Sequence, residues 1–281
     1  MSNLVLPNFL LIGAEKAGTT ALSQFLRQHP DVCFSRPKET WFFNRRYDRG
    51  IEWFASHFEH WDGETAVGEG TARLLQSRKA PARIRDHIPE AKLICILRNP
   101  IDRAFSQYHF YVYTGKVDPD RPFGEVIRDE SSDFRRDLVR QGKYIEHLRR
   151  YESLFGREQM HVVLHRPFRE DPLRIVTSIY RALGVDPSFI PEAESEHNVT
   201  RYPASRTVYE VLRKGWHAVG RRLEQYAPAA VDTLRGAVRR LFFHTDKPEM
   251  NERDRDYLRT EYAAANRELE DWLNRDLSHW R

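Results

Sequence analysis

The sequence contains little sulfur and no long apolar run. Its 281 residues include two cysteines, Cys33 and Cys95, too few for a disulfide framework and not part of a Cys/His cluster at the spacing of a zinc site. Both lie in short apolar runs, so we expect buried free thiols. No stretch approaches the roughly 20 apolar residues of a membrane-spanning helix. These absences exclude disulfide-stapled and membrane-spanning classes and favour a globular protein.

The start of the chain also lacks the pattern of a signal peptide. No charged segment precedes the first apolar run, and this run leads directly into a loop that contains glycine. We therefore expect a core strand here and a cytoplasmic protein. The net charge of +4 and the pI near 9.0 agree with anionic ligands but discriminate little. We expect no nucleic-acid partner.

Short apolar runs alternate with helical patterns along the chain. The predicted strands are Phe9–Ile12, Val32–Phe34, Ala66–Gly68, Leu93–Leu97 and His161–Leu164. The predicted helices are Thr20–Arg27, Pro100–Tyr111, Gly142–Phe155, Pro172–Leu183, Arg206–Gln225 and Glu252–Leu273. This alternation favours an α/β fold in which helices flank both faces of a central parallel sheet, a P-loop-like three-layer sandwich. We predict a single domain over residues 1–281, with the segment at about 195–250 as a helical C-terminal cap.

A glycine-bounded loop joins the first strand to the first helix. Gly13 and Gly18 have the spacing of a nucleotide-binding P-loop, but a P-loop continues with lysine and then serine or threonine. Here Thr19 follows Gly18, and the lysine, Lys16, lies inside the loop. Backbone amides and a helix N-terminus still converge on an anion in this arrangement. The sequence therefore predicts an anion site with a repositioned cation.

A second anion-binding element follows the apolar strand Leu93–Leu97. Arg98 ends this strand, Pro100 begins a helix, and Ser106 lies two turns along it. Ligands of open α/β sheets bind beyond the carboxyl ends of the strands. The planar fork of an arginine suits a phosphate, and a serine hydroxyl adds a donor. The alternative is that Arg98 pairs with a nearby carboxylate such as Asp102.

Three segments in this order resemble the sulfotransferases that use 3′-phosphoadenosine 5′-phosphosulfate (PAPS). They are Gly13-Ala-Glu-Lys-Ala-Gly-Thr-Thr-Ala-Leu, Lys38-Glu-Thr-Trp-Phe-Phe43 and Leu97-Arg-Asn-Pro-Ile-Asp-Arg-Ala-Phe-Ser106. The similarity is closest to the branch of the heparan sulfate N- and O-sulfotransferases and their bacterial relatives. It implies metal-free transfer of a sulfuryl group from PAPS to a hydroxyl or amine of a small molecule, lipid or saccharide.

The resemblance also implies roles for particular residues. Arg98 and Ser106 would bind the 3′-phosphate of the donor nucleotide. The 5′-phosphosulfate would be held by Lys16, Ala17, Gly18, Thr19 and Thr20. Lys16 is the expected catalytic lysine, because a cation at the bridging oxygen stabilises the charge that develops on the leaving phosphate.

The acceptor needs a base to take its proton. The resemblance points to Glu39, whose other reading is a salt bridge with Lys38 or another cation. Glu69 is a second candidate, and His57, His60 and His109 are further ones that match no motif. The glycosaminoglycan enzymes close over the nucleotide with a cysteine-bracketed basic loop, of which this chain retains only a fragment at Lys247 and Pro248.

Two other functions compete with sulfuryl transfer. A P-loop kinase or nucleotide triphosphatase requires a Lys-Ser/Thr pair after Gly18 and an acidic strand end for a metal, whereas the chain has Thr19, Thr20 and Arg98 at these places. A non-catalytic module would bind a nucleotide or an anionic glycan through its basic surface and would not depend on Lys16 or Glu39.

Overall fold

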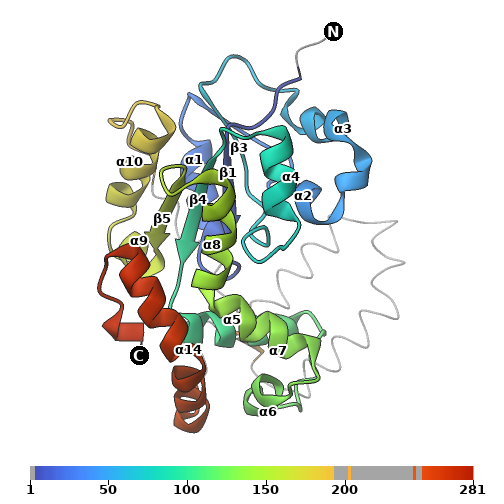
Figure 1. The fold of residues 1–281 in the computed structure, drawn as a ribbon, viewed down its shortest axis with the longest axis vertical. Coiled ribbons are helices and arrows are strands. Elements are labelled where there is room, and N and C mark those ends of the chain that lie inside the picture. The colour runs from blue at the N-terminus through green and yellow to red at the C-terminus, as the bar shows by residue number, and fades with distance from the viewer. Residues whose placement is uncertain (1–3, 193–201, 204–242, 245–248, 281) are drawn as a thin grey trace.

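The computed structural model describes residues 4–192, 202–203, 243–244 and 249–280 of the chain. The predicted cap at about 195–250 lies almost entirely outside these residues, as do the predicted helix at 206–225 and Lys247. Within the described residues, helices surround one main sheet in an α/β fold (Figure 1). A short antiparallel pair, β6 (Tyr202–Pro203) and β7 (Phe243–His244), forms a separate sheet.

Five parallel strands form the main sheet in the order β2-β3-β1-β4-β5. They are β1 (Phe9–Gly13), β2 (Val32–Phe34), β3 (Ala66–Glu69), β4 (Lys92–Leu97) and β5 (Met160–Leu164). All five predicted strands are present, each with its ends within one residue of the prediction. Every residue of β1 is buried, as expected for a central strand that is covered on both faces.

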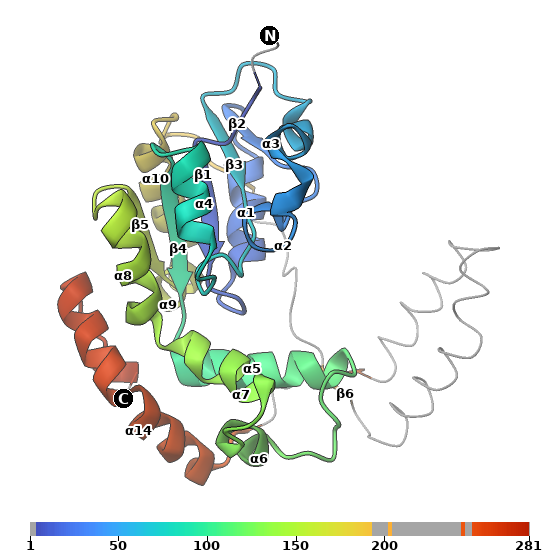
Figure 2. The same ribbon diagram turned by 45° about the vertical axis from the view of Figure 1, so that its right-hand side comes forward.

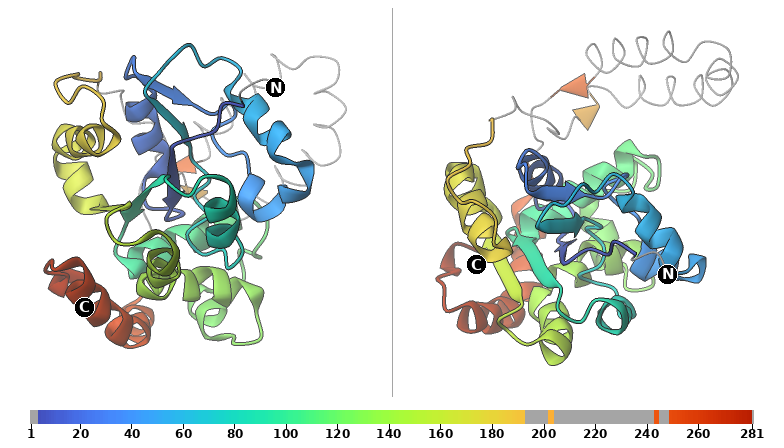
Figure 3. Two further views of the ribbon diagram at one scale, coloured as in Figure 1. Left: turned by 45° about the horizontal axis from the view of Figure 1, so that its top comes forward. Right: turned by 90° about the horizontal axis from the view of Figure 1, so that it is seen from above.

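Helices cover both faces of this sheet. On one face α1 (Thr19–Arg27) packs against α10 (Pro172–Leu183), and on the other α4 (Ala80–His87) packs against α8 (Tyr144–Phe155). The long helix α14 (Glu252–Leu273) lies along α8 (Figure 2). The views along other directions show the same layers, with the sheet between the two sets of helices (Figure 3). The predicted three-layer sandwich is therefore confirmed.

A second group of helices lies beyond the carboxyl edge of the sheet. It consists of α5 (Pro100–Tyr113), α6 (Phe123–Arg128) and α7 (Asp133–Leu138) (Figure 2). These helices and the first half of α14 share an apolar cluster that includes Phe105, Val126, Leu138 and Leu258. The cluster holds α5 next to the strand ends, where the loop after β1 also emerges.

Several short helices were not predicted from the sequence. They are α2 (Phe42–Arg45), α3 (Ile51–Ala55), α4, α6, α7 and α9 (His165–Glu170), together with the 3₁₀ turns Tyr47–Arg49, Ser56–Phe58, Arg140–Gly142 and Ser278–Trp280. The helices among them have four to eight residues. Such segments are too short to show a repeating apolar face. Of the predicted helix at 142–155, Gly142 is the last residue of the preceding 3₁₀ turn, and α8 covers Tyr144–Phe155.

Candidate active site

The loop between β1 and α1 has a backbone that requires glycine at both ends. Gly13 has a φ of 155°, and a Cβ there would lie 2.8 Å from the carbonyl oxygen of Ala72. Gly18 has a φ of 101° and occupies the N-cap position of α1. Because a glycine cap has no side chain, the amides of the first helical turn remain available to an anion.

Lys16 lies inside this loop with its side chain directed to α5. Its amino group is 4.4 Å from the ring centroid of Phe110, a cation–π contact. Burial lowers the pKa of Lys16, the neighbouring Glu15 carboxylate opposes this change, and Arg98 adds to it. The ammonium is thus drawn partly out of water beside the loop, where its charge acts more strongly on a bound anion.

Arg98 connects the loop to the end of β4. Its guanidinium donates a hydrogen bond to the carbonyl oxygen of Lys16 at 3.1 Å. The backbone of Arg98 is held in turn, because the hydroxyl of Tyr144 donates to its carbonyl oxygen at 2.9 Å. Trp280 packs edge-on against the Tyr144 ring, with centroids 6.2 Å apart. The two predicted halves of the anion site are therefore brought together.

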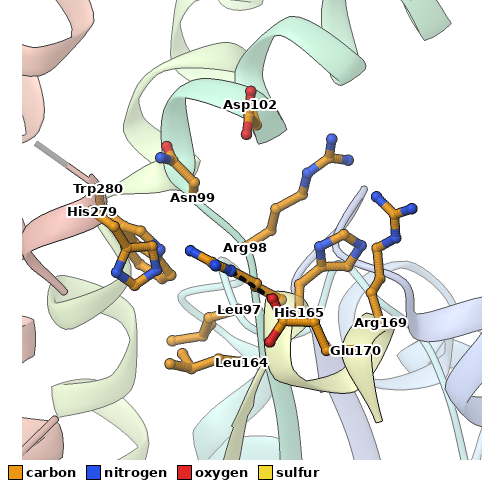
Figure 4. Close-up of a pocket in the computed structure, with 11 residues that line it drawn as sticks. Leu97, Arg98, Asn99, Asp102, Leu164, His165, Arg169, Glu170, His279 and Trp280 are labelled. Atoms are coloured by element: carbon orange, nitrogen blue, oxygen red, sulfur yellow. Dashed lines mark hydrogen bonds and ion pairs between the residues drawn. The ribbon is translucent and has the colours of Figure 1, made fainter. Parts of the chain in front are cut away.

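A pocket of about 610 Å³ opens at the ends of β4 and β5. It is lined by Leu97, Arg98, Asn99, Asp102, Leu164, His165, Arg166, Arg169, Glu170, His279 and Trp280. The side chains of Arg98, His165 and Arg169 lie on one side of it, and those of His279 and Trp280 lie opposite (Figure 4). Three arginines face two carboxylates, those of Asp102 and Glu170, so the lining of the pocket is basic on balance.

His165 connects this pocket to the glycine loop. A Cβ on Gly18 would lie 3.3 Å from the Cδ2 of His165, so the imidazole sits against the loop. Burial, followed by the charges of Arg98 and Arg169, lowers the pKa of His165 to about 4. Neither His165 nor Arg169 was predicted from the sequence. Their place after the strand His161–Leu164 is the signal that could have found them.

Glu39 and Thr19 both contact Lys38. The Nζ of Lys38 lies 3.4 Å from the Oε1 of Glu39 and 3.4 Å from the Oγ1 of Thr19. The Glu39 side chain is 30% exposed. The predicted ion pair with Lys38 is therefore present, and the carboxylate still faces solvent, as a group that receives a proton from an acceptor must.

Glu69 is fully engaged inside the protein. Its carboxylate accepts hydrogen bonds from the backbone amides of Thr40 at 2.9 Å and Thr71 at 3.0 Å, and from both threonine hydroxyls. The side chain is buried, and this burial raises the pKa of Glu69. Four donors leave this carboxylate little freedom to serve an acceptor. It braces the segment that carries Glu39.

The remaining predicted residues have simpler surroundings. Ser106 is buried on α5, two turns beyond Pro100. The ring of His57 packs against Trp53, His60 lies 3.2 Å from the carbonyl oxygen of Phe34, and His109 packs against Phe105. Both cysteines are free and buried, as predicted.

A charged network behind the loop was not predicted. Arg73 lies between Glu15 and Asp137, at 3.6 and 2.8 Å, and Asp137 also accepts a hydrogen bond from the Tyr111 hydroxyl at 2.6 Å. These contacts lower the pKa of Asp137 against the opposing effect of burial. The network connects the residue before Lys16 to α5 and α7. No spacing rule pairs positions so far apart in the sequence.

The described residues contain no group of three histidine, cysteine or acidic side chains arranged to hold a metal ion. None of the helices in the described ranges is long and apolar enough to span a membrane.

Comparison with known proteins identifies the family to which this fold and this loop belong. The family model for the sulfotransferase domain matches residues 6–216, so the chain belongs to the sulfotransferase domain family. A crystal structure of a sulfotransferase from Alicyclobacillus acidocaldarius superposes with a TM-score of 0.73 and 27% identity, over 99% of each chain. The predicted α/β fold and family resemblance are confirmed.

Two curated relatives are similar over shorter ranges. The membrane-associated sulfotransferase kil1 of Dictyostelium discoideum is 38% identical over 135 residues, which are 46% of this chain and 29% of that protein. The bifunctional heparan sulfate N-deacetylase/N-sulfotransferase 1 of Mus musculus is 36% identical over 195 residues, 64% of this chain and 22% of that protein. The match thus spans less than a third of these relatives.

Proposed function

We propose that the protein transfers a sulfuryl group from PAPS to a hydroxyl or amine of an acceptor, without a metal ion. The observation that carries this proposal is the hydrogen bond from Arg98 to the carbonyl oxygen of Lys16. This hydrogen bond joins the glycine loop, with its internal lysine, to the arginine at the end of β4, the strand that pairs with β1. A donor with phosphates at both ends of its ribose requires such a double site.

The residues present fit this nucleotide. The amides of α1, Thr19 and Thr20 would hold the 5′-phosphosulfate, and Arg98 with Ser106 would hold the 3′-phosphate. The basic pocket beside His165 and Arg169 would accept the nucleoside. When bound, the donor supplies an activated sulfuryl group on a phosphate leaving group. These assignments follow the strand ends at which α/β folds bind ligands.

Lys16 and Glu39 would carry the chemistry. Lys16, partly buried and next to the loop amides, would stabilise the negative charge that develops on the leaving phosphate. Glu39, 30% exposed, would accept the proton of the acceptor hydroxyl or amine. Both relatives named above are called sulfotransferases, and the family membership of this chain supports the same class of reaction.

The kinase alternative has less support. Its loop would place a lysine immediately after Gly18, yet Thr19 stands there, and the end of β4 carries Arg98 in place of an acidic side chain. The non-catalytic alternative leaves unexplained why the partly buried Lys16 packs against Phe110 next to the loop.

Thermal unfolding tests the donor. We expect 3′-phosphoadenosine 5′-phosphate (PAP) to raise the unfolding midpoint in the presence of EDTA, because a ligand at 100 times its Kd adds about 2.7 kcal/mol to the free energy of unfolding. Stabilisation by ATP with magnesium, and not by PAP, would contradict the proposal. Transfer of label from sulfur-labelled PAPS to saccharides, lipids and small alcohols or amines then identifies the acceptor, and Lys16→Ala serves as the inactive control.

A further inference from the structure

A second lysine lies at the point where the donor loop and the proposed base meet. The Nζ of Lys38 is within 3.4 Å of both the Thr19 Oγ1 and the Glu39 Oε1. Thr19 belongs to the loop that would hold the phosphosulfate, and Glu39 would face the acceptor. A group that touches both residues lies on the path of the transferred sulfuryl group.

The position of Lys38 is fixed by its backbone. Its carbonyl oxygen accepts hydrogen bonds from the amide of Gly70 and from the hydroxyl of Ser35, each at 3.1 Å. Its stem passes beside Gly70, where a Cβ would lie 3.4 Å from the Cε of Lys38. The side chain is only 18% exposed. The backbone and the stem of Lys38 are therefore held in place by their neighbours, unlike those of an exposed surface lysine.

The charges around Lys38 leave it able to bind an anion. The carboxylates of Glu39 and Glu69 face it, as does the guanidinium of Arg27, and burial lowers the pKa of Lys38. An ammonium has three N–H donors. Within the described residues, its contacts to Glu39 and Thr19 account for two of them, and the third is available to a ligand oxygen.

We propose that Lys38 is a catalytic residue whose ammonium contacts the oxygens of the sulfuryl group during transfer and holds Glu39 towards the acceptor. This assignment rests on the proposed function. In the transfer, the bond between sulfur and the bridging oxygen breaks and its electron pair stays on the phosphate. A bond forms between sulfur and the acceptor oxygen or nitrogen, the acceptor proton passes to Glu39, and Lys38 keeps its proton.

This role differs from that of Lys16. Lys16 lies over Phe110 and its carbonyl oxygen is bound by Arg98, and the proposed function assigns it to the leaving phosphate. Lys38 contacts Thr19 from the segment that carries the base. Because PAP lacks the sulfuryl group, removing Lys38 should affect PAPS and spare PAP, whereas removing a residue that binds the nucleotide should affect both.

The experiment compares PAP and PAPS on purified variants. Isothermal titration gives both Kd values, and single-turnover hydrolysis of PAPS gives a rate that needs no acceptor. The variants are Lys38→Met, Lys38→Arg and Lys92→Met, with Lys38→Gln as the neutral variant if Lys38→Met does not fold. Lys92 is the matched control. It is an exposed lysine at the first position of β4, at the amino end of the strand and away from the carboxyl ends where Lys38 lies.

We expect the Kd of Lys38→Met for PAP to stay within about threefold of the wild type. Its affinity for PAPS should fall about tenfold, because one hydrogen bond to a charged group is lost. Hydrolysis of PAPS should slow at least as much. Lys38→Arg should recover part of the preference for PAPS, and Lys92→Met should match the wild type. Equal weakening of PAP and PAPS, or no change in either, would overturn the assignment. A wild type that binds neither nucleotide overturns the proposed function itself, and this assignment with it.

Discussion

The guanidinium of Arg98 donates a hydrogen bond to the backbone carbonyl of Lys16, the residue expected to act on the leaving group. One side chain thereby fixes the lysine-bearing loop and lines the neighbouring basic pocket. A ligand that moved Arg98 would therefore also change what holds the backbone of Lys16.

Replacing Arg98 should weaken nucleotide binding strongly. We expect Arg98→Ala to lose about 10- to 100-fold in affinity for PAP, because a hydrogen bond to a charged group contributes about 1.5–3 kcal/mol. Arg98→Lys should lose nearly as much, since the planar fork is absent. Isothermal titration measures both, and Arg181→Ala, an exposed site on α10, is the control. An unchanged affinity in Arg98→Ala would place the nucleotide elsewhere.

Phe110 should act on the rate of transfer through Lys16. The amino group of Lys16 rests 4.4 Å from the centre of its ring, a contact typically contributing about 0.5–2 kcal/mol. We expect Phe110→Leu to slow single-turnover PAPS hydrolysis about three- to thirtyfold, while the Kd for PAP changes little. Phe110→Tyr keeps the ring and should remain close to the wild type. If Leu and Tyr variants behave alike, the ring does not position the lysine.

The two glutamates should separate stability from transfer. Glu69→Gln replaces a carboxylate that accepts four hydrogen bonds by an amide, whose NH₂ cannot accept the bonds made to the oxygen that it replaces. We expect it to lower the free energy of unfolding by about 1–3 kcal/mol, as measured by urea denaturation. Glu39→Gln should leave this free energy within about 0.5 kcal/mol, keep PAP binding and lose transfer. Normal transfer by Glu39→Gln would move the base to another residue.

His165 should make the free energy of unfolding depend on pH. The pKa of its imidazole is lowered to about 4 in the folded protein, against 6.5 ordinarily, so the unfolded chain takes up the proton first as the pH falls. The contribution of His165 to stability is therefore complete above pH 6.5 and is lost between pH 6.5 and about 4. Urea denaturation at pH 7.0, 5.5 and 4.5 measures this loss, because these pH values run from above the ordinary pKa of 6.5 to near the lowered pKa of about 4.

A neutral replacement isolates the effect of His165. His165→Gln should show a smaller fall in unfolding free energy over this range than the wild type, whereas His279→Gln, at an exposed pocket residue, should not. An identical pH profile for His165→Gln and the wild type would show that the imidazole does not titrate in this way.

The sequence predicted the elements that rest on short-range patterns. The strand ends at Gly13 and Arg98 follow from apolar runs that stop at a glycine or an arginine, and α10 and α14 have the predicted bounds. The contact of Lys38 with Thr19 and the cage of threonines around Glu69 could not be predicted in this way. The cage joins segments that become neighbours when β2 and β3 pair, and the contact of Lys38 with Thr19 also requires β1 to pair with β3. A single sequence carries no record of such pairing.

The same limit applies to the basic pocket. His165 and Arg169 follow β5 in the sequence but contribute to a site whose loop follows β1. Their meeting depends on β1, β4 and β5 lying side by side. The resemblance to sulfotransferases assigned roles only to residues inside its three motifs, Arg98 and Ser106 among them, and to none of the residues that directly follow β5.

The support of Arg98 by Tyr144 and Trp280 has a consequence for how the protein is made. Trp280 lies at the far end of the described chain, and it packs against the tyrosine that holds the backbone of Arg98. A ribosome releases the glycine loop and β4 well before this tryptophan. During synthesis Arg98 therefore leaves the ribosome before the tryptophan that supports Tyr144, and this part of the site is complete only after Trp280 has packed against that ring.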